Sequence, residues 1–155
     1  MTENLTSTLR QRIASDGPLS VADYMQAALL DPDHGYYSTQ EPFGVDGDFI
    51  TAPEISQMFG ELIGLWAAVV WQGLGSPETI ALVELGPGRG SLMSDVLRAS
   101  RAVPDFSSAI EVHVIEASPR LRQIQRETLV GHDITWHDDI EGIPGVPSIT
   151  IANEF

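Results

Sequence analysis

The chain has 155 residues, the length of one ordinary domain, and its composition already excludes several kinds of chemistry. It contains neither cysteine nor lysine, which excludes disulfides, thiolate zinc sites, cysteine nucleophiles and lysine Schiff bases. Its formal net charge of −14 argues against nucleic acid as a partner and favours a basic peptide or a small cation. Solubility alone is the simpler explanation of this charge.

The N-terminal residues carry no recognisable targeting signal. They lack the apolar core of a secretion signal, and they do not have the arginine-rich, acid-poor composition of an organellar transit peptide. No apolar run in the chain approaches the roughly 18 residues of a membrane span. We therefore predict a soluble, cytoplasmic protein.

Residues 1–50 are predicted to form an N-terminal helical segment followed by a loop, which we treat as one domain. A second helix in this segment has a start that resembles a capping box, formed by Ser20 and Asp23. The residues from Asp31 onward are rich in glycine, proline and aspartate, which is typical of a long loop. The first helix is indicated by one apolar face, consisting of Leu5, Leu9 and Ile13.

A long helix is predicted to begin at Thr51, which forms a capping box with Glu54. Apolar residues then follow at the i, i+3, i+4, i+7 spacing of one helical face, which predicts that they lie in the core. This stripe consists of Ile55, Met58, Phe59, Leu62, Ile63, Trp66, Val69 and Val70. Gly73 and Gly75 are expected to end the helix.

From residue 79 onward the pattern alternates between predicted strands and predicted helices. This alternation predicts an α/β fold, in which residues 51–155 form a parallel sheet with helices on both faces. The ligand is then expected at the carboxyl ends of the strands. The strands are predicted at 79–85, 111–116, 133–137 and 148–152, and the helices at 91–100 and from 118 onward. The helix residues expected to face inward are Leu92, Val96, Leu97, Leu121, Ile124 and Leu129.

A glycine-rich loop, VELGPGRG, follows the first of these strands. Gly86, Gly88 and Gly90 give the spacing G-x-G-x-G, whereas the dinucleotide fingerprint is G-x-G-x-x-G. Glu84 stands two residues before the first glycine, where its carboxylate would repel a pyrophosphate and attract an ammonium or sulfonium group. S-adenosylmethionine carries both cations and has no phosphate. These four residues are therefore predicted to bind that cofactor, although a tight strand–helix turn also explains a glycine loop.

Acidic residues at the ends of the next two strands complete the predicted cofactor site. Glu116 follows Gly90 by 26 residues, beyond the roughly 20 expected of a ribose-binding acid, and a loop at 99–110 is expected to take up the difference. Glu116 is predicted to bind both ribose hydroxyls. Asp138 and Asp139 are predicted to meet the adenine amino group, or else to be solvated turn residues. The residues expected to flank the adenine ring are Trp136 or Ile140.

A metal site is the alternative for the histidines and aspartates near the third predicted strand. On one strand and its turns such side chains point in different directions, so no metal site is predicted. The residues concerned are His132, Asp133, His137, Asp138 and Asp139.

Several motifs together resemble a known enzyme family. Class I S-adenosylmethionine-dependent methyltransferases have three motifs that are similar to VELGPGRG, VIEASP and HDDI in this chain. A narrower resemblance, to the MidA-like methyltransferases, is carried by DPDHGYY, GDFITAPEISQMFGELIGLW and the final ANEF. It extends from about Leu19 to Phe155. This family includes a mitochondrial complex I assembly factor that methylates a protein arginine.

The resemblance implies a Rossmann-like methyltransferase fold and methyl transfer to an arginine nitrogen of a protein. Carboxylates bind an arginine guanidinium, and Glu154, with Asn153 beside it, is the expected catalytic residue at the strand edge. Asp48, Glu54 and Glu61 are expected to help bind the substrate, although helix capping also explains Glu54. The expected partner is an arginine-containing protein such as a respiratory-complex subunit, and neither nucleic acid nor a membrane.

The resemblance also implies a sheet of seven strands, of which this chain supplies the first four. We therefore expect an N-terminal portion of a longer methyltransferase, inactive alone and completed by the C-terminal half of the same fold. Two other functions stay open at this point: an NAD-dependent oxidoreductase, and a non-catalytic assembly or scaffold protein that retains a cofactor fold. The glycine spacing and Glu84 count against NAD.

Overall fold

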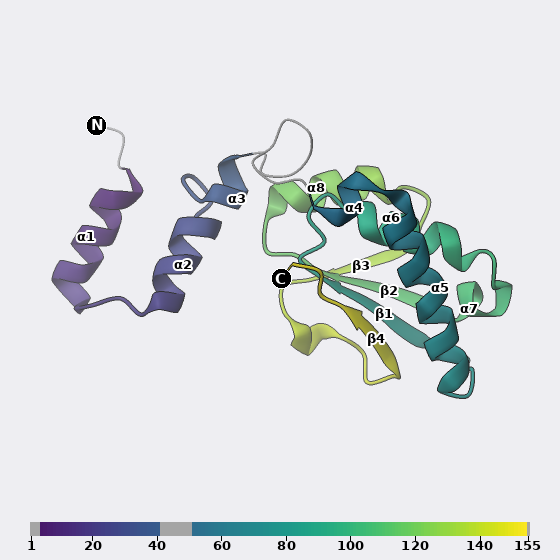
Figure 1. The fold of residues 1–155 in the computed structure, drawn as a ribbon. Helices are drawn as coiled ribbons and strands as arrows, with labels where there is room; N and C mark the ends of the chain where they lie inside the picture. The colour runs from purple at the N-terminus through teal and green to yellow at the C-terminus, as the bar shows by residue number, and fades with distance from the viewer. Residues whose placement is uncertain (1–3, 41–50, 155) are drawn as a thin grey trace. The chain divides into compact units, whose positions relative to one another are not determined.

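The computed structural model describes residues 4–40 and 51–154, and the chain divides into two compact units, residues 1–42 and 43–155. The first unit is helical and the second contains the sheet (Figure 1). No described helix is long and apolar enough to cross a membrane. The predicted domain boundary at residue 50 lies outside the described residues.

The first unit contains the helices α1 (Leu5–Asp16), α2 (Val21–Leu30) and α3 (Tyr36–Thr39). The side chain of Asn4 caps α1, and that of Ser20 caps α2 by accepting the Asp23 N–H. The Asp23 carboxylate in turn accepts hydrogen bonds from the Ser20 hydroxyl, at 2.6 Å, and from the Ser20 backbone N–H, which confirms the predicted capping box. Part of the predicted long loop is helical instead, because α3 lies within it.

The second unit opens with two helices where one was predicted. These are α4 (Ala52–Ile55) and α5 (Gln57–Gly73). Between them Ser56 has an extended backbone, and its side chain accepts the Met58 N–H at the start of α5. Thr51 makes no side-chain capping bond within the described residues, and Glu54 accepts a bond from Ser91, so the predicted capping box is wrong.

The inward face of α5 is lined mainly by small residues rather than by the predicted apolar stripe. A Cβ atom on Gly60 would lie 2.5 Å from the Asp95 Cβ, and one on Gly64 would lie 2.7 Å from the Val96 carbonyl oxygen. Helix α5 therefore packs directly against α6 (Ser91–Ser100), where larger side chains would force the two helices apart. The stripe divides: Phe59, Ile63 and Val70 pack on the core, whereas Ile55, Met58, Leu62, Trp66 and Val69 are exposed, contrary to the prediction.

Four parallel strands form one sheet in the order β3-β2-β1-β4. They are β1 (Ile80–Leu85), β2 (Ile110–Ile115), β3 (Ile134–His137) and β4 (Ser148–Ile151). The helices α6 and α7 (Pro104–Ala109) connect β1 to β2, and α8 (Pro119–Thr128) connects β2 to β3. The predicted α/β fold with parallel strands is confirmed. Helix α7 lies where a loop was expected.

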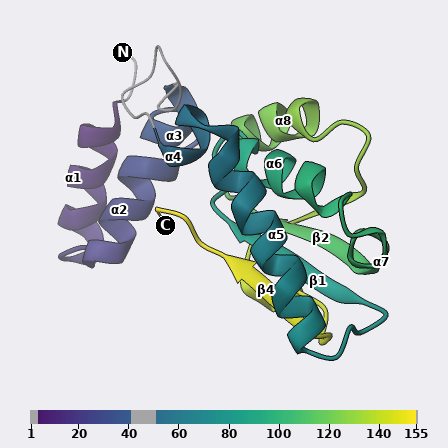
Figure 2. The same ribbon diagram turned by 45° about the vertical axis from the view of Figure 1, so that its right-hand side comes forward.

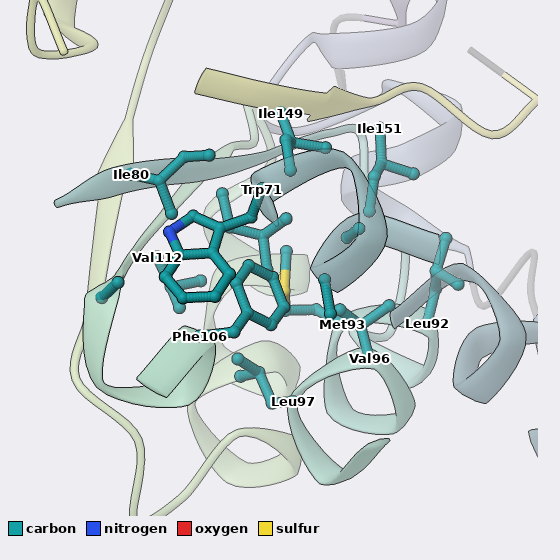
Figure 3. Packing of buried hydrophobic residues seen from close by; sticks show 14 of the residues in the cluster. Trp71, Ile80, Leu92, Met93, Val96, Leu97, Phe106, Val112, Ile149 and Ile151 are labelled. Atoms are coloured by element: carbon teal, nitrogen blue, oxygen red, sulfur yellow. The ribbon is translucent and has the colours of Figure 1, made fainter. Parts of the chain in front are cut away.

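The main hydrophobic cluster lies on one face of the sheet, although Ala81 and Val83, which point to the other face, are also buried. Leu82 is paired in register with Val112 on β2 and with Ile149 on β4, so the three side chains point to the same face. There they meet Trp71 from α5 and Phe106 from α7 (Figure 3). Helices α5 and α6 lie side by side over this face (Figure 2). The residues predicted to face inward from the helices at 91–100 and from 118 onward are buried, except for Ile124, which is half-buried.

The connections from β1 to β2 and from β2 to β3 run in the same direction along the sheet, so right-handed crossovers place α6, α7 and α8 on the same face. The connection from β3 to β4 contains only the 3-10 helix η1 (Ile140–Gly142). Pro144 and Pro147, with Gly145 between them, disfavour a longer helix in this connection. For the described residues, the expectation of helices on both faces is therefore wrong.

Candidate cofactor site

The candidate site lies at the carboxyl edge of the sheet, around β1. The next two strands in the chain lie on one side of β1 and β4 lies on the other, so the strand order reverses there. Parallel α/β sheets bind their ligands at such a reversal. The Gly86 N–H donates to the Ile115 carbonyl at 3.0 Å, and the Glu116 N–H donates to the His137 carbonyl at 3.3 Å. The segments that follow β1, β2 and β3 therefore begin side by side.

The glycine loop leads from β1 into α6. Gly86, Gly88 and Gly90 have φ angles of +57°, +55° and +85°, which residues with side chains rarely adopt. The loop is closed by a bond of 2.8 Å from the Gly90 N–H to the Pro87 carbonyl. The shape of the backbone thus favours glycine at all three positions, whatever the loop binds.

The Glu84 carboxyl group is buried at the end of β1, directly before this loop. Its side chain is 2% exposed and accepts a hydrogen bond from the Met93 N–H, while Oε2 has no partner among the described residues. Burial outweighs that bond and raises the pKa of Glu84 to about 8. A buried, incompletely paired carboxyl group is costly unless a ligand supplies a donor or a positive charge. Glu84 therefore fits the predicted contact with an ammonium or sulfonium group.

Glu116 lies at the end of β2, beside the glycine loop, and is also buried. Its Oε1 accepts the Ser118 N–H at 2.8 Å, and its Oε2 accepts Gln125 Nε2 at 3.0 Å. Burial raises the pKa of Glu116, and these two bonds oppose the rise. Each carboxylate oxygen can accept a second hydrogen bond, so the group suits a pair of hydroxyl donors such as a ribose diol.

A buried glutamine that the sequence analysis did not single out joins the glycine loop to Glu116. Gln125 on α8 donates from Nε2 to the Gly88 carbonyl oxygen at 2.8 Å, as well as to Glu116. Its signal in the sequence is its spacing, because it lies four residues after Leu121 and four before Leu129, both of which are buried. A search for apolar periodicity passes over such a residue because it is polar.

The two aspartates predicted to meet adenine follow β3 and are exposed. Asp138 Oδ1 accepts a bond of 2.6 Å from Arg122, and Asp139 Oδ1 accepts the Glu141 N–H and so caps η1. Asp139 thus makes a side-chain bond to a nearby backbone N–H that is typical of a turn residue, which was the alternative prediction for this aspartate. The indole N–H of Trp136 donates to Gln125, and the adenine contacts stay predictions.

The predicted catalytic residues follow β4, on the other side of β1 from Glu116. Asn153 Nδ2 lies 3.5 Å from Glu154 Oε1, and Glu154 is exposed. The φ angle of Glu154 is +56°, which is uncommon for a residue with a side chain and costs conformational energy. Because Ile151 pairs with Glu84 across the sheet, both residues lie close to the end of β1.

The acids predicted to bind the substrate contact different partners. Glu54 Oε1 accepts the Ser91 hydroxyl at 2.6 Å, so this carboxylate lies at the start of α6, directly after the glycine loop. Glu61 instead pairs with Arg98 at 2.9 Å, and Arg98 also pairs with Asp95. Asp48 lies outside the described residues. Of the two described acids, Glu54 is the one whose contacts connect it to the candidate site.

No three histidine or acidic side chains of the described part of the chain are grouped to hold a metal ion. Within the cluster near β3, His137 Nε2 instead lies 2.9 Å from His113 Nδ1 on β2.

A buried acid directly before the glycine loop would repel a pyrophosphate, so this edge of the sheet suits a cationic cofactor such as S-adenosylmethionine better than a dinucleotide. Residues 62–155 match the model of a family described as S-adenosyl-L-methionine-dependent methyltransferases. The chain belongs to this family. The predicted family, fold and cofactor class are confirmed, and the NAD alternative is not supported.

Curated relatives carry the name protein arginine methyltransferase NDUFAF7, mitochondrial. The protein of Danio rerio is 40% identical over 176 residues, which cover 99% of this chain and 42% of that protein. The protein of Homo sapiens is 38% identical over 171 residues, covering 95% of this chain and 39% of that protein. The chain therefore spans about 40% of the length of these relatives.

A solved structure is similar over most of the chain. It is a COG1565 superfamily member from Burkholderia thailandensis bound to S-adenosyl-homocysteine. The two share a TM-score of 0.73 and 32% sequence identity, over 87% of this chain and 37% of that chain.

The predicted cytoplasmic location is wrong on these comparisons. The relatives from Danio rerio, Drosophila melanogaster and Homo sapiens are all labelled mitochondrial. The prediction depended on the absence of a transit-peptide composition, and such an absence does not define a compartment.

Proposed function

We propose that this protein is a protein arginine methyltransferase that binds S-adenosylmethionine at the carboxyl edge of its sheet. The observation that carries the proposal is the buried Glu84 carboxyl group, which has an unpaired oxygen directly before the glycine loop. A cation is the ligand group that such a site needs, and a pyrophosphate is the group that it would repel.

Each part of the site has a proposed role in binding the cofactor. Glu84 holds the positive charge of the methionine part, and the glycines at 86, 88 and 90 allow the backbone to approach closely. Glu116 accepts bonds from the ribose hydroxyls. Asp138 and Asp139 meet the adenine amino group.

The methyl acceptor is proposed to approach from the end of β4. When bound, S-adenosylmethionine would supply a methyl group on a positively charged sulfur. The arginine nitrogen would form a bond to the methyl carbon in line with the breaking carbon–sulfur bond, whose electrons return to sulfur, and would release one proton to solvent. Glu154 pairs with the substrate guanidinium and Asn153 orients Glu154, so that catalysis depends on position and charge. Glu54, beside the glycine loop, and Glu61 and Asp48 are further candidates for holding a basic substrate. The net charge of −14 favours the approach of a cationic protein.

Calorimetric titration tests the cofactor assignment. We expect the chain to bind S-adenosylhomocysteine, whose amino group is cationic, and not NAD. Glu84→Gln should weaken S-adenosylhomocysteine binding roughly tenfold, because the carboxyl group can ionise against the ligand's ammonium group and the amide cannot. Glu78→Gln makes the same change on an exposed residue just before β1 and should have no effect. NAD binding without a response to S-adenosylhomocysteine would refute the proposal.

Mass spectrometry of methylated peptides tests the acceptor. Arginine peptides, including ones drawn from respiratory-complex subunits, should gain methyl groups when the active protein is supplied with S-adenosylmethionine. Matched peptides with lysine in place of arginine should not, because a lysine ammonium cannot form the paired bonds of a guanidinium. Equal methylation of both peptides would remove the arginine assignment and leave the cofactor assignment standing.

A further inference from the structure

One buried glutamine connects three segments of the candidate site. Gln125 has an exposed fraction of 0%, yet both polar atoms of its carboxamide are paired. Nε2 donates to the Gly88 carbonyl oxygen at 2.8 Å and to Glu116 Oε2 at 3.0 Å, and Oε1 accepts Trp136 Nε1 at 2.9 Å. A single side chain on α8 thus joins the glycine loop, the acid at the end of β2, and β3.

The orientation of this carboxamide is determined by Trp136. An indole N–H can only donate, so the Gln125 atom that it meets must be the oxygen. The two hydrogens on Nε2 are then directed at the two acceptors, the Gly88 carbonyl and the Glu116 carboxylate. The indole itself is held by Arg126, whose guanidinium lies over the ring at 5.3 Å from its centroid.

Packing alone does not account for a glutamine at this position. An apolar residue of similar volume would fill the space between Leu121 and Leu129 without removing polar atoms from water. A buried carboxamide avoids that desolvation cost only when all its atoms are paired, as they are here. What glutamine adds over an apolar residue is therefore the relative placement of the Gly88 carbonyl and the Glu116 carboxylate.

We propose that Gln125 is a positioning residue, which sets the glycine loop and the Glu116 carboxylate in the relative geometry that S-adenosylmethionine requires. This rests on the proposed function, in which Glu116 binds the ribose and the loop lies against the cofactor. Donation from Gln125 also favours the ionised form of Glu116, which is the form that accepts bonds from two hydroxyls.

The test is the affinity for S-adenosylhomocysteine, measured by calorimetry on folded variants. Gln125→Met removes all three bonds and keeps most of the volume, so it should weaken binding about tenfold, the scale of lost bonds to a charged group. Gln123→Met makes the same change elsewhere on α8, where Gln123 is exposed and donates to Glu127. This control should bind like the parent.

Coupling to Glu116 separates positioning from a general structural effect. Glu116→Gln should weaken binding by itself, and adding Gln125→Met should then cost clearly less than it costs in the parent, because both changes act on one ribose contact. Fully additive losses would overturn the proposal. Parent-like affinity of a folded Gln125→Met variant would overturn it too.

A milder variant keeps the proposal testable if Gln125→Met does not fold. Trp136→Phe removes the donor that orients the carboxamide and keeps an aromatic ring under Arg126, so binding should weaken about threefold. Unchanged affinity in folded Trp136→Phe would then contradict the positioning role. If the parent itself does not bind S-adenosylhomocysteine, the proposed function and this inference fail together. If the parent binds and the variants bind equally well, only the inference fails.

Discussion

Glu84 connects the candidate site to the stability of the fold through its ionisation. Its pKa rises from 4.5 to about 8 on folding, so over this range the folded state holds a proton that the unfolded chain has released. The free energy of unfolding therefore falls as pH rises from about 4.5 to about 8, by at most about 1.4 kcal/mol per pH unit. We predict that Glu84→Gln removes this dependence, because the amide does not ionise.

Urea denaturation of parent and variant at about pH 5 and about pH 8 measures the effect. The free energy of unfolding of Glu84→Gln, relative to the parent, should be higher at the upper pH. Contributions from histidines and other acids cancel in this difference. Glu78→Gln, on an exposed acid, should show the same difference at both pH values. A flat difference for Glu84→Gln as well would mean that Glu84 is ionised throughout.

A substitution at Gly88 tests whether the glycine loop contacts the cofactor, when its effect is compared with that of a backbone-straining substitution elsewhere. Valine at this position is strained by the φ angle of +55° and would fill space that the cofactor is proposed to occupy. We predict that Gly88→Val abolishes S-adenosylhomocysteine binding in calorimetry. Gly75→Val is the matched control, since Gly75 has a φ of +86° and a Cβ atom there would meet nothing within 4 Å. It should lose about 1–2 kcal/mol of stability and bind normally. Equal binding by both variants would show that the cofactor does not approach Gly88.

At the scale of elements, the contact between α5 and α6 depends on small residues. Gly64→Ala places a methyl group against the Val96 backbone, 2.7 Å from its carbonyl oxygen, and should lower the free energy of unfolding by about 1–3 kcal/mol. Gly73→Ala makes the same substitution at the end of the same helix, in open space, and should be neutral or stabilising by up to about 1 kcal/mol. Chemical denaturation of both variants measures the contrast. If Gly64→Ala is as stable as Gly73→Ala, the two helices are farther apart than these distances indicate.

The elements that could be predicted from the sequence are those whose local signals agree. The strand before Gly86 is apolar except for Glu84 and is followed by glycines, and the capping box at Ser20 has both of its partners. The inward face of α5 could not be read from apolar periodicity, because that helix has apolar residues on both of its faces. Similarly, a capping-box pattern at Thr51 did not reveal that Ser56 starts a new helix.

Some residues of the candidate site could likewise be predicted from the sequence, and others could not. Glu84 and Glu116 could be predicted from their positions at strand ends, because parallel strands bring their carboxyl ends to one edge. Gln125 could not, because its importance depends on three partners that are far apart in the sequence. The partners of Glu61 and Asp139 are likewise visible only once the helices and turns are in place.

At the scale of the whole molecule, two surfaces of the described second unit expose groups that favour contact with another chain. The outer face of α5 exposes Met58, Leu62, Trp66 and Val69. Strand β4 pairs with β1 on one side, and no described strand pairs with its other side. Exposed apolar stripes and unpaired strand edges promote association between chains. The chain also spans about 40% of the length of its relatives.

We therefore predict that the 155-residue chain alone binds S-adenosylhomocysteine but self-associates and transfers no methyl group to arginine peptides. Sedimentation velocity measures the self-association, and a mass-spectrometric assay with arginine peptides measures methyl transfer. The physical reason is that Glu154, which is proposed to bind the acceptor arginine, can act only if the substrate is held on both sides, and no described strand lies on the outer side of β4. Leu62→Glu should reduce self-association of the chain alone, because it places a charge in the apolar stripe. A monomeric, cooperatively unfolding 155-residue protein that methylates arginine peptides would contradict the prediction.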